Sequence, residues 1–141
     1  MDTAVLFLVF NRPDTTRAVF EAIRKARPSR LYVAADGARS DRNVEAKQCA
    51  EVRRIATEVD WPCEVRTLFR DTNLGCKKAV FEAITWFFKH ESEGIILEDD
   101  CLPDPSFFPY CSELLEKYRD EPKIMTIGGN YFALNGQIPE I

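Results

Sequence analysis

The sequence predicts an α/β fold in which a mostly parallel sheet carries helices on both faces. Short apolar runs of strand length alternate with longer segments whose apolar residues recur at helical spacing. The chain has 141 residues, 45% hydrophobic and 30% charged, which is enough to bury one core. Strands separated by helices imply right-handed crossovers and parallel pairing. We therefore expect one folded unit over residues 1–141.

The first half of the chain predicts two strands, each followed by a helix. Residues 4–10 form an apolar run, and a polar turn leads into a helix over 15–27 whose apolar residues share one face. Pro28 ends this helix, because proline has no N–H for the helical hydrogen bond. Residues 30–35 predict the second strand, and 43–58 predict the second helix.

The second half repeats this order. Residues 63–69 predict a third strand, and 76–90 predict the most regular helix of the chain. The isoleucine- and leucine-rich run 94–98 predicts a fourth strand in the centre of the sheet. A fourth helix starts at 104–106, and 124–127 predicts a short fifth strand. The apolar stripe expected on the third helix consists of Cys76, Ala79, Val80, Ala83, Ile84 and Phe87.

The composition argues against several classes of function. The net charge is -4, and no basic block could follow a nucleic-acid backbone, so we expect no nucleic-acid partner. The apolar opening is too short for a membrane span or a signal peptide, which favours a cytoplasmic or cytosol-facing protein. Five cysteines without a Cys-x-x-Cys pair predict reduced thiols. The single histidine, His90, argues against catalytic triads.

Three adjacent carboxylates, Glu98, Asp99 and Asp100, end the fourth predicted strand. Two like charges about 5 Å apart repel by roughly 3 kcal/mol at an effective dielectric constant near 20, so a positive partner is expected. Carboxylates suit a hard cation such as Mg²⁺ or Mn²⁺, which is commonly held by one or two of them together with substrate phosphates. The alternatives are a solvated acidic turn, or arginines of the same chain that tie up these side chains, which would remove the argument for an ion.

Polar residues follow four of the predicted strands. The carboxyl ends of parallel strands lie at one edge of a sheet, where ligands of such folds bind. A binding cleft is therefore expected at this edge. The residues that would meet there are Asn11 with Arg12, Asp36 with Gly37, Asn73 with its neighbours Asp71 and Thr72, and the acidic run 98–100.

Two stretches of the chain resemble nucleotide-diphospho-sugar glycosyltransferases of the GT-A fold. The segment 73–79 leads through a helix into Ile-Leu-Glu-Asp-Asp at 96–100, which is similar to the family-two pattern of Asn-x-Gly, helix and Asp-x-Asp-type motif. Glu-Asp-Asp followed by 101–108 is similar to the N-acetylglucosaminyltransferase I type. The segments 9–13 and 35–37 fit the same comparison.

The likeness extends over residues 5–130 and includes bacterial hemolytic-protein-like glycosyltransferases. It implies a Rossmann-like sheet of the GT-A type and transfer of a sugar from a nucleoside diphosphate, with UDP favoured, to an acceptor hydroxyl. By this resemblance Asp100 would bind the Mg²⁺ or Mn²⁺ that bridges the diphosphate, and Glu98 and Asp99 would face the sugar and ribose. Base and ribose contacts are implied for Asn11, Arg12, Asp36 and Gly37, and a donor contact for Asn73.

Each of these assignments has a structural alternative. Arg12 can pair with Asp14, and the pair 36–37 is a common turn. Asn73 can cap the following helix. Lys77 can attract phosphate together with the positive end of that helix, or lie on a solvated face.

The resemblance leaves the general base unassigned. Complete GT-A domains continue into an acceptor-binding half, whereas this sequence ends at Ile141. We therefore expect residues 1–141 to be the donor-binding part of an incomplete domain, whose exposed sheet surface would allow two copies to associate. The alternative function is a non-catalytic nucleotide-binding or interaction module. A nucleotidyltransferase is a third, weaker alternative, because it would also use an acidic metal cluster. Such enzymes usually have a glycine-rich basic loop near their start, which residues 9–12 do not supply.

Overall fold

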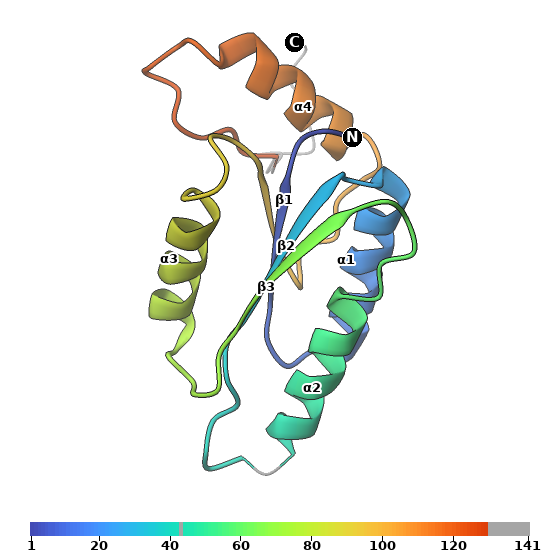
Figure 1. Cartoon of the computed structure of the whole chain (residues 1–141), viewed down its shortest axis with the longest axis vertical. Helices are drawn as coiled ribbons and strands as arrows, with labels where there is room; N and C mark the ends of the chain where they lie inside the picture. The colour runs from blue at the N-terminus through green and yellow to red at the C-terminus, as the bar shows by residue number, and fades with distance from the viewer. Residues whose placement is uncertain (43, 130–141) are drawn as a thin grey trace, which may run out of the picture.

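Four parallel strands form the centre of the computed structural model, which describes residues 1–42 and 44–129 (Figure 1). The strands pair in the order β3-β2-β1-β4, and all pairings are parallel. This arrangement confirms the predicted α/β class with a parallel, Rossmann-like sheet. The strands are β1 (Val5–Val9), β2 (Arg30–Ala35), β3 (Glu64–Phe69) and β4 (Ile95–Glu98).

Helices cover both faces of the sheet, as predicted. Helices α1 (Pro13–Ala26) and α2 (Glu45–Ala56) lie on one face, and α3 (Cys76–Phe87) lies on the other (Figure 1). Helix α4 (Phe107–Tyr118) lies at the end of the molecule that holds the N-terminus (Figure 1).

Alternate residues of each strand point to opposite faces and build two cores. On β1, Val5 and Phe7 belong to the core that includes residues of α1, α2 and α4. Leu6 and Leu8 belong to the core beneath α3. The all-apolar sequence of β1 thus follows from its burial on both faces.

The prediction that the fourth strand is central was wrong. Within the described residues β4 pairs with β1 alone and lies at the edge of the sheet. Ile95 and Leu97 are buried because they face the core beside α1, whereas Ile96 is partly exposed. The apolar content of this run therefore reports side-chain packing and not the number of paired neighbours.

The predicted fifth strand at 124–127 is also absent from the described structure. These residues pair with no strand there, and Met125 is 91% exposed. Ile124 instead donates its N–H to the carbonyl of Glu121 at 3.0 Å, which closes a turn. A short apolar run forms a strand only where a sheet edge is available to pair with it.

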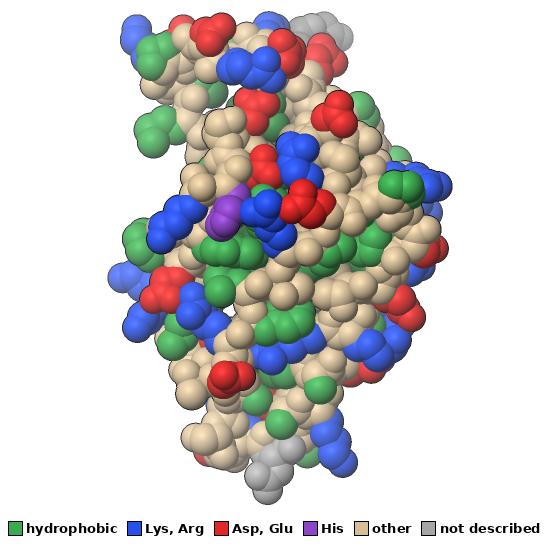
Figure 2. Space-filling model, viewed as in Figure 1, with side chains coloured by type: hydrophobic (Ala, Val, Ile, Leu, Met, Phe, Trp, Pro, Cys, Tyr) green, Lys and Arg blue, Asp and Glu red, His purple; other side chains and the backbone are tan. Residues whose placement is uncertain are grey.

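The surface carries mixed charge, as the interspersed sequence suggests. Lys and Arg side chains lie among Asp and Glu on the face drawn in Figure 2. Among the helices that the structure describes, none is sufficiently long and apolar to cross a membrane.

Phe87 provides a test of the core beneath α3. Its side chain is fully buried and packs edge-on against Tyr32, with ring centroids 4.9 Å apart. We expect Phe87→Ala to lower the free energy of unfolding by about 3–5 kcal/mol, because it removes a buried ring and leaves a cavity. On the same helix, Phe81 is 69% exposed, and Phe81→Ala should change stability by no more than about 0.5 kcal/mol. Urea unfolding followed by circular dichroism measures both; equal losses would contradict this packing.

Candidate functional site

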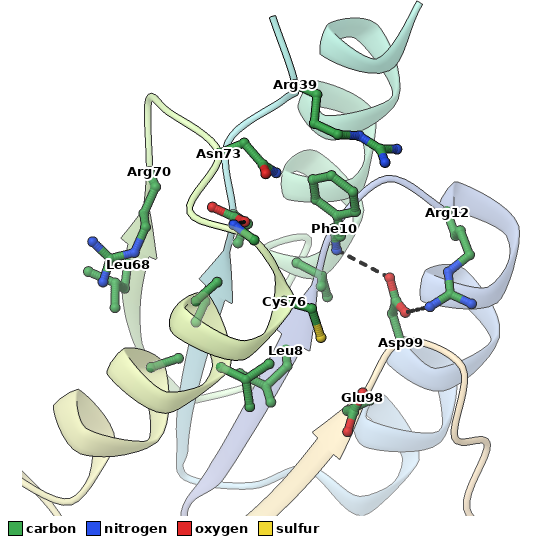
Figure 3. Close-up of a pocket in the computed structure, with 18 residues that line it drawn as sticks. Leu8, Phe10, Arg12, Arg39, Leu68, Arg70, Asn73, Cys76, Glu98 and Asp99 are labelled. Carbon is green, nitrogen blue, oxygen red and sulfur yellow. Dashed lines mark hydrogen bonds and ion pairs between the residues drawn. The ribbon is translucent and has the colours of Figure 1, made fainter. Parts of the chain in front are cut away.

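A cavity of about 330 Å³ opens at the carboxyl edge of the sheet, between the strands and the first turns of α3 (Figure 3). This is the edge at which the sequence predicts a cleft. Its interior is lined by small and apolar side chains, namely Leu8, Ala34, Leu68, Ala79, Val80 and Ala83. Polar side chains also line it, namely Arg12, Asp36, Arg39, Arg70, Asn73, Glu98 and Asp99.

Part of the apolar stripe predicted for the third helix lines this cavity. Ala83 and Phe87 are buried in the core, as expected. Cys76 is exposed, and it lines the cavity together with the partly buried Ala79 and Val80. Small side chains on α3 thus leave space between the helix and the sheet.

Asp99 is the buried member of the acidic run, with 3% exposure. Its Oδ2 accepts the backbone N–H of Phe10 at 3.2 Å, and its Oδ1 accepts Arg12 Nη2 at 3.0 Å (Figure 3). Burial raises the pKa of Asp99, and this effect exceeds the opposing attraction of Arg12. In turn, Asp99 is the main cause of the raised pKa of the Arg12 guanidinium. The end of β4 is thereby tied to the turn between β1 and α1.

Arg12 bridges two of the three carboxylates. Besides Asp99, it contacts Asp100, with 3.0 Å between Nη1 and Oδ2. The structural alternative in which Arg12 pairs with Asp14 is therefore wrong. Since the positive partner expected for the acidic run is an arginine of the same chain, charge repulsion no longer requires an ion there.

Asp100 is the carboxylate that the resemblance assigns to a hard cation. No group of three or more His, Cys, Asp and Glu side chains suited to a metal occurs in the described part of the chain. A Mg²⁺ ion, however, needs only one or two protein carboxylates when phosphate oxygens and water complete its shell. The Asp100 side chain is 42% exposed, and its Oδ1 is contacted by Cys101 Sγ at 3.6 Å. Glu98 and Asp99 line the cavity, whereas Asp100 does not.

Asp36 joins two loops of the cavity rim. Its carboxylate accepts the backbone N–H groups of Gly37 and Leu74 at 2.9 Å and of Gly75 at 3.0 Å. Asn73 donates its Nδ2 to the Gly37 carbonyl at 2.8 Å, and it does not cap α3, which has no side-chain cap. The predicted residues Asp36, Gly37 and Asn73 are thus brought together, and they hold the loop after β2 against the loop before α3.

Gly37 is required by this close approach. A Cβ added there would lie 2.4 Å from the carbonyl carbon of Thr72, a backbone atom that cannot rotate away. The loop after β2 therefore has room only for a residue without a side chain at this position.

Sequence reasoning missed a second ion pair beside the cavity. Glu45, with 3% exposure, accepts Asn11 Nδ2 at 2.8 Å and the backbone N–H of Arg39 at 2.8 Å, and it forms an ion pair with the Arg39 guanidinium. Hydrogen bonds from Arg39 are the main cause that lowers the pKa of Glu45 to about 2. Asn11 is thus held by protein atoms.

Arg70 was missed as well. Its Nη2 lies 2.6 Å from Glu82 Oε2, and its side chain lines the cavity. Arg12 was identified because it follows β1. Arg70 directly follows β3, so the same criterion could have identified it. Lys77, in contrast, was considered as a phosphate contact, but it is exposed on the first turn of α3 and does not line the cavity.

The chain was also compared with known proteins. No protein-family model matches it, and no curated protein gives a significant match. The resemblance to GT-A glycosyltransferases therefore remains a hypothesis that depends on the residues described above.

Replacing Gly37 tests the loop contact. We expect Gly37→Ala to lower the free energy of unfolding by roughly 1–3 kcal/mol, because the added methyl group must displace backbone of the neighbouring loop. Gly128→Ala is the control, since a Cβ there meets no atom within 4 Å. Urea midpoints of both variants measure the difference, and an unchanged midpoint for Gly37→Ala would show that the two loops are not in contact.

The lowered pKa of Glu45 predicts a pH-dependent stability. An ordinary glutamate titrates near 4.5, and Glu45 titrates near 2, so its ion pair stabilises the fold fully above about pH 4.5. This stabilisation is lost as the pH falls from 4.5 towards 2. We expect Glu45→Gln to be less stable than the wild type at neutral pH, and the difference to shrink through this window. Unfolding in urea at several pH values measures it; a constant difference would contradict the ion pair.

Proposed function

We propose that this chain binds a nucleotide-sugar donor, with UDP as the favoured nucleotide, and supplies the donor-binding part of a metal-dependent glycosyltransferase. The observation that carries this proposal is the cavity at the carboxyl edge of a parallel sheet, with the acidic run beside it. The resemblance of the segments 73–79 and 96–100 to the GT-A pattern supports the same reading.

The dimensions and lining of the cavity suit such a donor. Its volume of about 330 Å³ lies within the range of about 300–1,000 Å³ typical of small-molecule pockets. Apolar side chains inside it can contact the flat face of a base, while carboxylates at the rim can accept hydrogen bonds from ribose or sugar hydroxyls. Glu98 is the best placed of these, since it lines the cavity and has no ion-pair partner among the described residues.

The charges of the rim support a cation as partner of the diphosphate. Each of its three arginines contacts a carboxylate of the chain: Arg12 pairs with Asp99, Arg39 with Glu45, and Arg70 with Glu82. Glu98 adds a negative charge that Arg12 does not contact. The lining holds three arginines and three carboxylates, Asp36, Glu98 and Asp99, so a diphosphate would meet no excess of positive charge, and an added cation would favour its binding.

Asp100 is the residue that would hold this cation, Mg²⁺ or Mn²⁺, with help from Glu98. The chemistry that the ion supplies when bound is neutralisation of the charge on the diphosphate leaving group. The residues of this chain bind and orient the donor: Asp99 fixes the turn after β1, and Asp36 fixes the loops around the cavity mouth. The acceptor hydroxyl would attack the anomeric carbon, and no described residue is assigned as its base.

A second candidate function is a non-catalytic nucleotide-binding or interaction module. The observation that favours it is the engagement of Asp100 by Arg12, which leaves the acidic run partly neutralised without an ion. Both functions fit a cytosolic setting, because the five cysteines are free thiols. Association of two copies remains part of the proposal, and transfer from a UDP-sugar to an added acceptor distinguishes the enzyme from the module.

Calorimetric titration with UDP tests the donor site. We expect the full chain to bind UDP at least about tenfold more tightly with Mn²⁺ present than without it, a gain of about 1.4 kcal/mol. Asp100→Asn should remove this gain, because it removes the charged oxygen that holds the ion. Asp120→Asn, an exposed position in the turn after α4, is the control for charge and should keep the gain. Equal UDP affinity in all conditions would exclude the metal assignment.

A further inference from the structure

An apolar strip on α3, made of Phe81, Thr85 and Phe88, is exposed on the side of the helix that faces away from the sheet. Phe81 is 69% exposed and Phe88 is 47% exposed, and they lie about two helical turns apart. Helical hydrogen bonding reaches Phe88, because its N–H donates to the carbonyl of Ile84 at 3.0 Å. Both rings therefore lie on one side of α3, which forms the outer layer of the molecule there (Figure 1).

The hydroxyl group in the middle of the apolar strip is satisfied by the helix itself. Thr85 Oγ1 donates to the carbonyl of Phe81 at 2.8 Å. Burying a polar group costs free energy only if it loses its hydrogen bonds, and this bond stays intact when water is removed from the surface. The apolar strip can therefore leave water at little cost.

Lysines lie at both ends of the apolar strip. Lys77 and Lys78 are exposed on the first turn of α3, and Lys89 is exposed directly after the strip. The carboxylate of Glu82, which lies on the same helix, is contacted by Arg70 at 2.6 Å and by Lys78 at 3.9 Å. Along the edge formed by α3, at the left of Figure 2, hydrophobic side chains lie beside Lys and Arg side chains. A chain with a net charge of -4 thus presents positive charge around exposed phenylalanines.

An anionic lipid surface fits this combination better than a protein partner does. The exposed parts of the two rings amount to less than about 300 Å², because a whole aromatic side chain buries about 150–250 Å². A stable protein interface buries about 800 Å² on each partner. A bilayer needs no matching surface of that size, since aromatic side chains enter its headgroup region while neighbouring lysines meet the negative headgroups.

We propose that the exposed face of α3 docks on a membrane surface that contains anionic lipids. Phe81 and Phe88 enter between the headgroups, and the three lysines lie against the lipid phosphates. The opposite face of α3 stays packed on the sheet through Ala83 and Phe87, so docking requires no rearrangement of the fold. This inference is independent of the proposed function, because neither ring of the apolar strip lines the cavity.

Co-sedimentation of the full chain with lipid vesicles tests the docking. We expect vesicles of phosphatidylcholine and phosphatidylglycerol in equal parts to bind the chain at least about tenfold more tightly than phosphatidylcholine alone. Phe81→Ala should weaken binding to the mixed vesicles on the order of tenfold, because one inserted ring is lost. Lys78→Gln combined with Lys89→Gln should weaken it on the order of tenfold as well, with the folding of all variants checked by circular dichroism.

Matched controls lie on the other face of the sheet. Leu102 is 64% exposed and lines a hollow with Ala22 of α1, so Leu102→Ala removes an equally exposed apolar group away from α3. Lys25→Gln combined with Lys47→Gln removes two exposed charges from α1 and α2. Both controls should bind the mixed vesicles like the wild type. Equal losses in the controls, or a loss in the α3 lysine variant without one in Phe81→Ala, would overturn the docking.

Poly-glutamate fixed on beads distinguishes a membrane from an acidic protein, because it carries negative charge without an apolar layer. Retention on these beads without binding to the mixed vesicles would indicate an acidic protein partner and overturn the proposal, as would binding to neither. The donor site is tested separately, since UDP affinity of Phe81→Ala should match that of the wild type. Loss of vesicle binding alone therefore leaves the donor site standing, and failure to bind UDP leaves the docking standing.

Discussion

The buried carboxylate of Asp99 is the interaction on which the site depends. A charged group with 3% exposure is stable only if its oxygens are satisfied, and here one accepts the N–H of Phe10 and the other the guanidinium of Arg12. These two contacts connect the end of β4 to the turn after β1. The strands β1 and β4 are neighbours in the sheet. The position of Arg12, and through it that of Asp100, follows from this one buried group.

A second buried carboxylate organises the opposite side of the cavity. Asp36 accepts three backbone N–H groups, from Gly37, Leu74 and Gly75, so the loops after β2 and β3 behave as one unit. These hydrogen bonds occupy the Asp36 oxygens, which by the resemblance would contact the nucleotide base and ribose of the sugar donor. Asp36 therefore shapes the cavity mouth whether or not it also contacts a ligand, and the donor contact remains a prediction.

The sequence predicted the elements well because their signals are local. Strand β2 was placed at its observed bounds, and the turn residues 36–37 and Asn73 were rightly expected at one edge. The errors concern partners: an apolar run does not reveal whether it lies at the centre of a sheet, as for 94–98, or has any strand to pair with, as for 124–127. The alternative that arginines of the same chain engage the acidic run was correct, although it did not name Arg12. The ion pairs of Arg39 and Arg70 were missed, since no spacing rule relates these arginines to carboxylates elsewhere in the chain.

The engagement of Asp100 by Arg12 bears on the choice between enzyme and binding module. Three adjacent carboxylates without a counter-charge would weaken the fold, so an internal arginine stabilises the ion-free state. The cost of replacing it is small, because the Asp100 end is half-exposed. A cation alone gains only carboxylate ligands when it displaces Arg12, whereas a cation that arrives with a diphosphate also brings phosphate oxygens. The Arg12–Asp100 pair is therefore compatible with the proposed donor site only if the cation arrives together with the nucleotide, and it fits a binding module that holds no ion equally well.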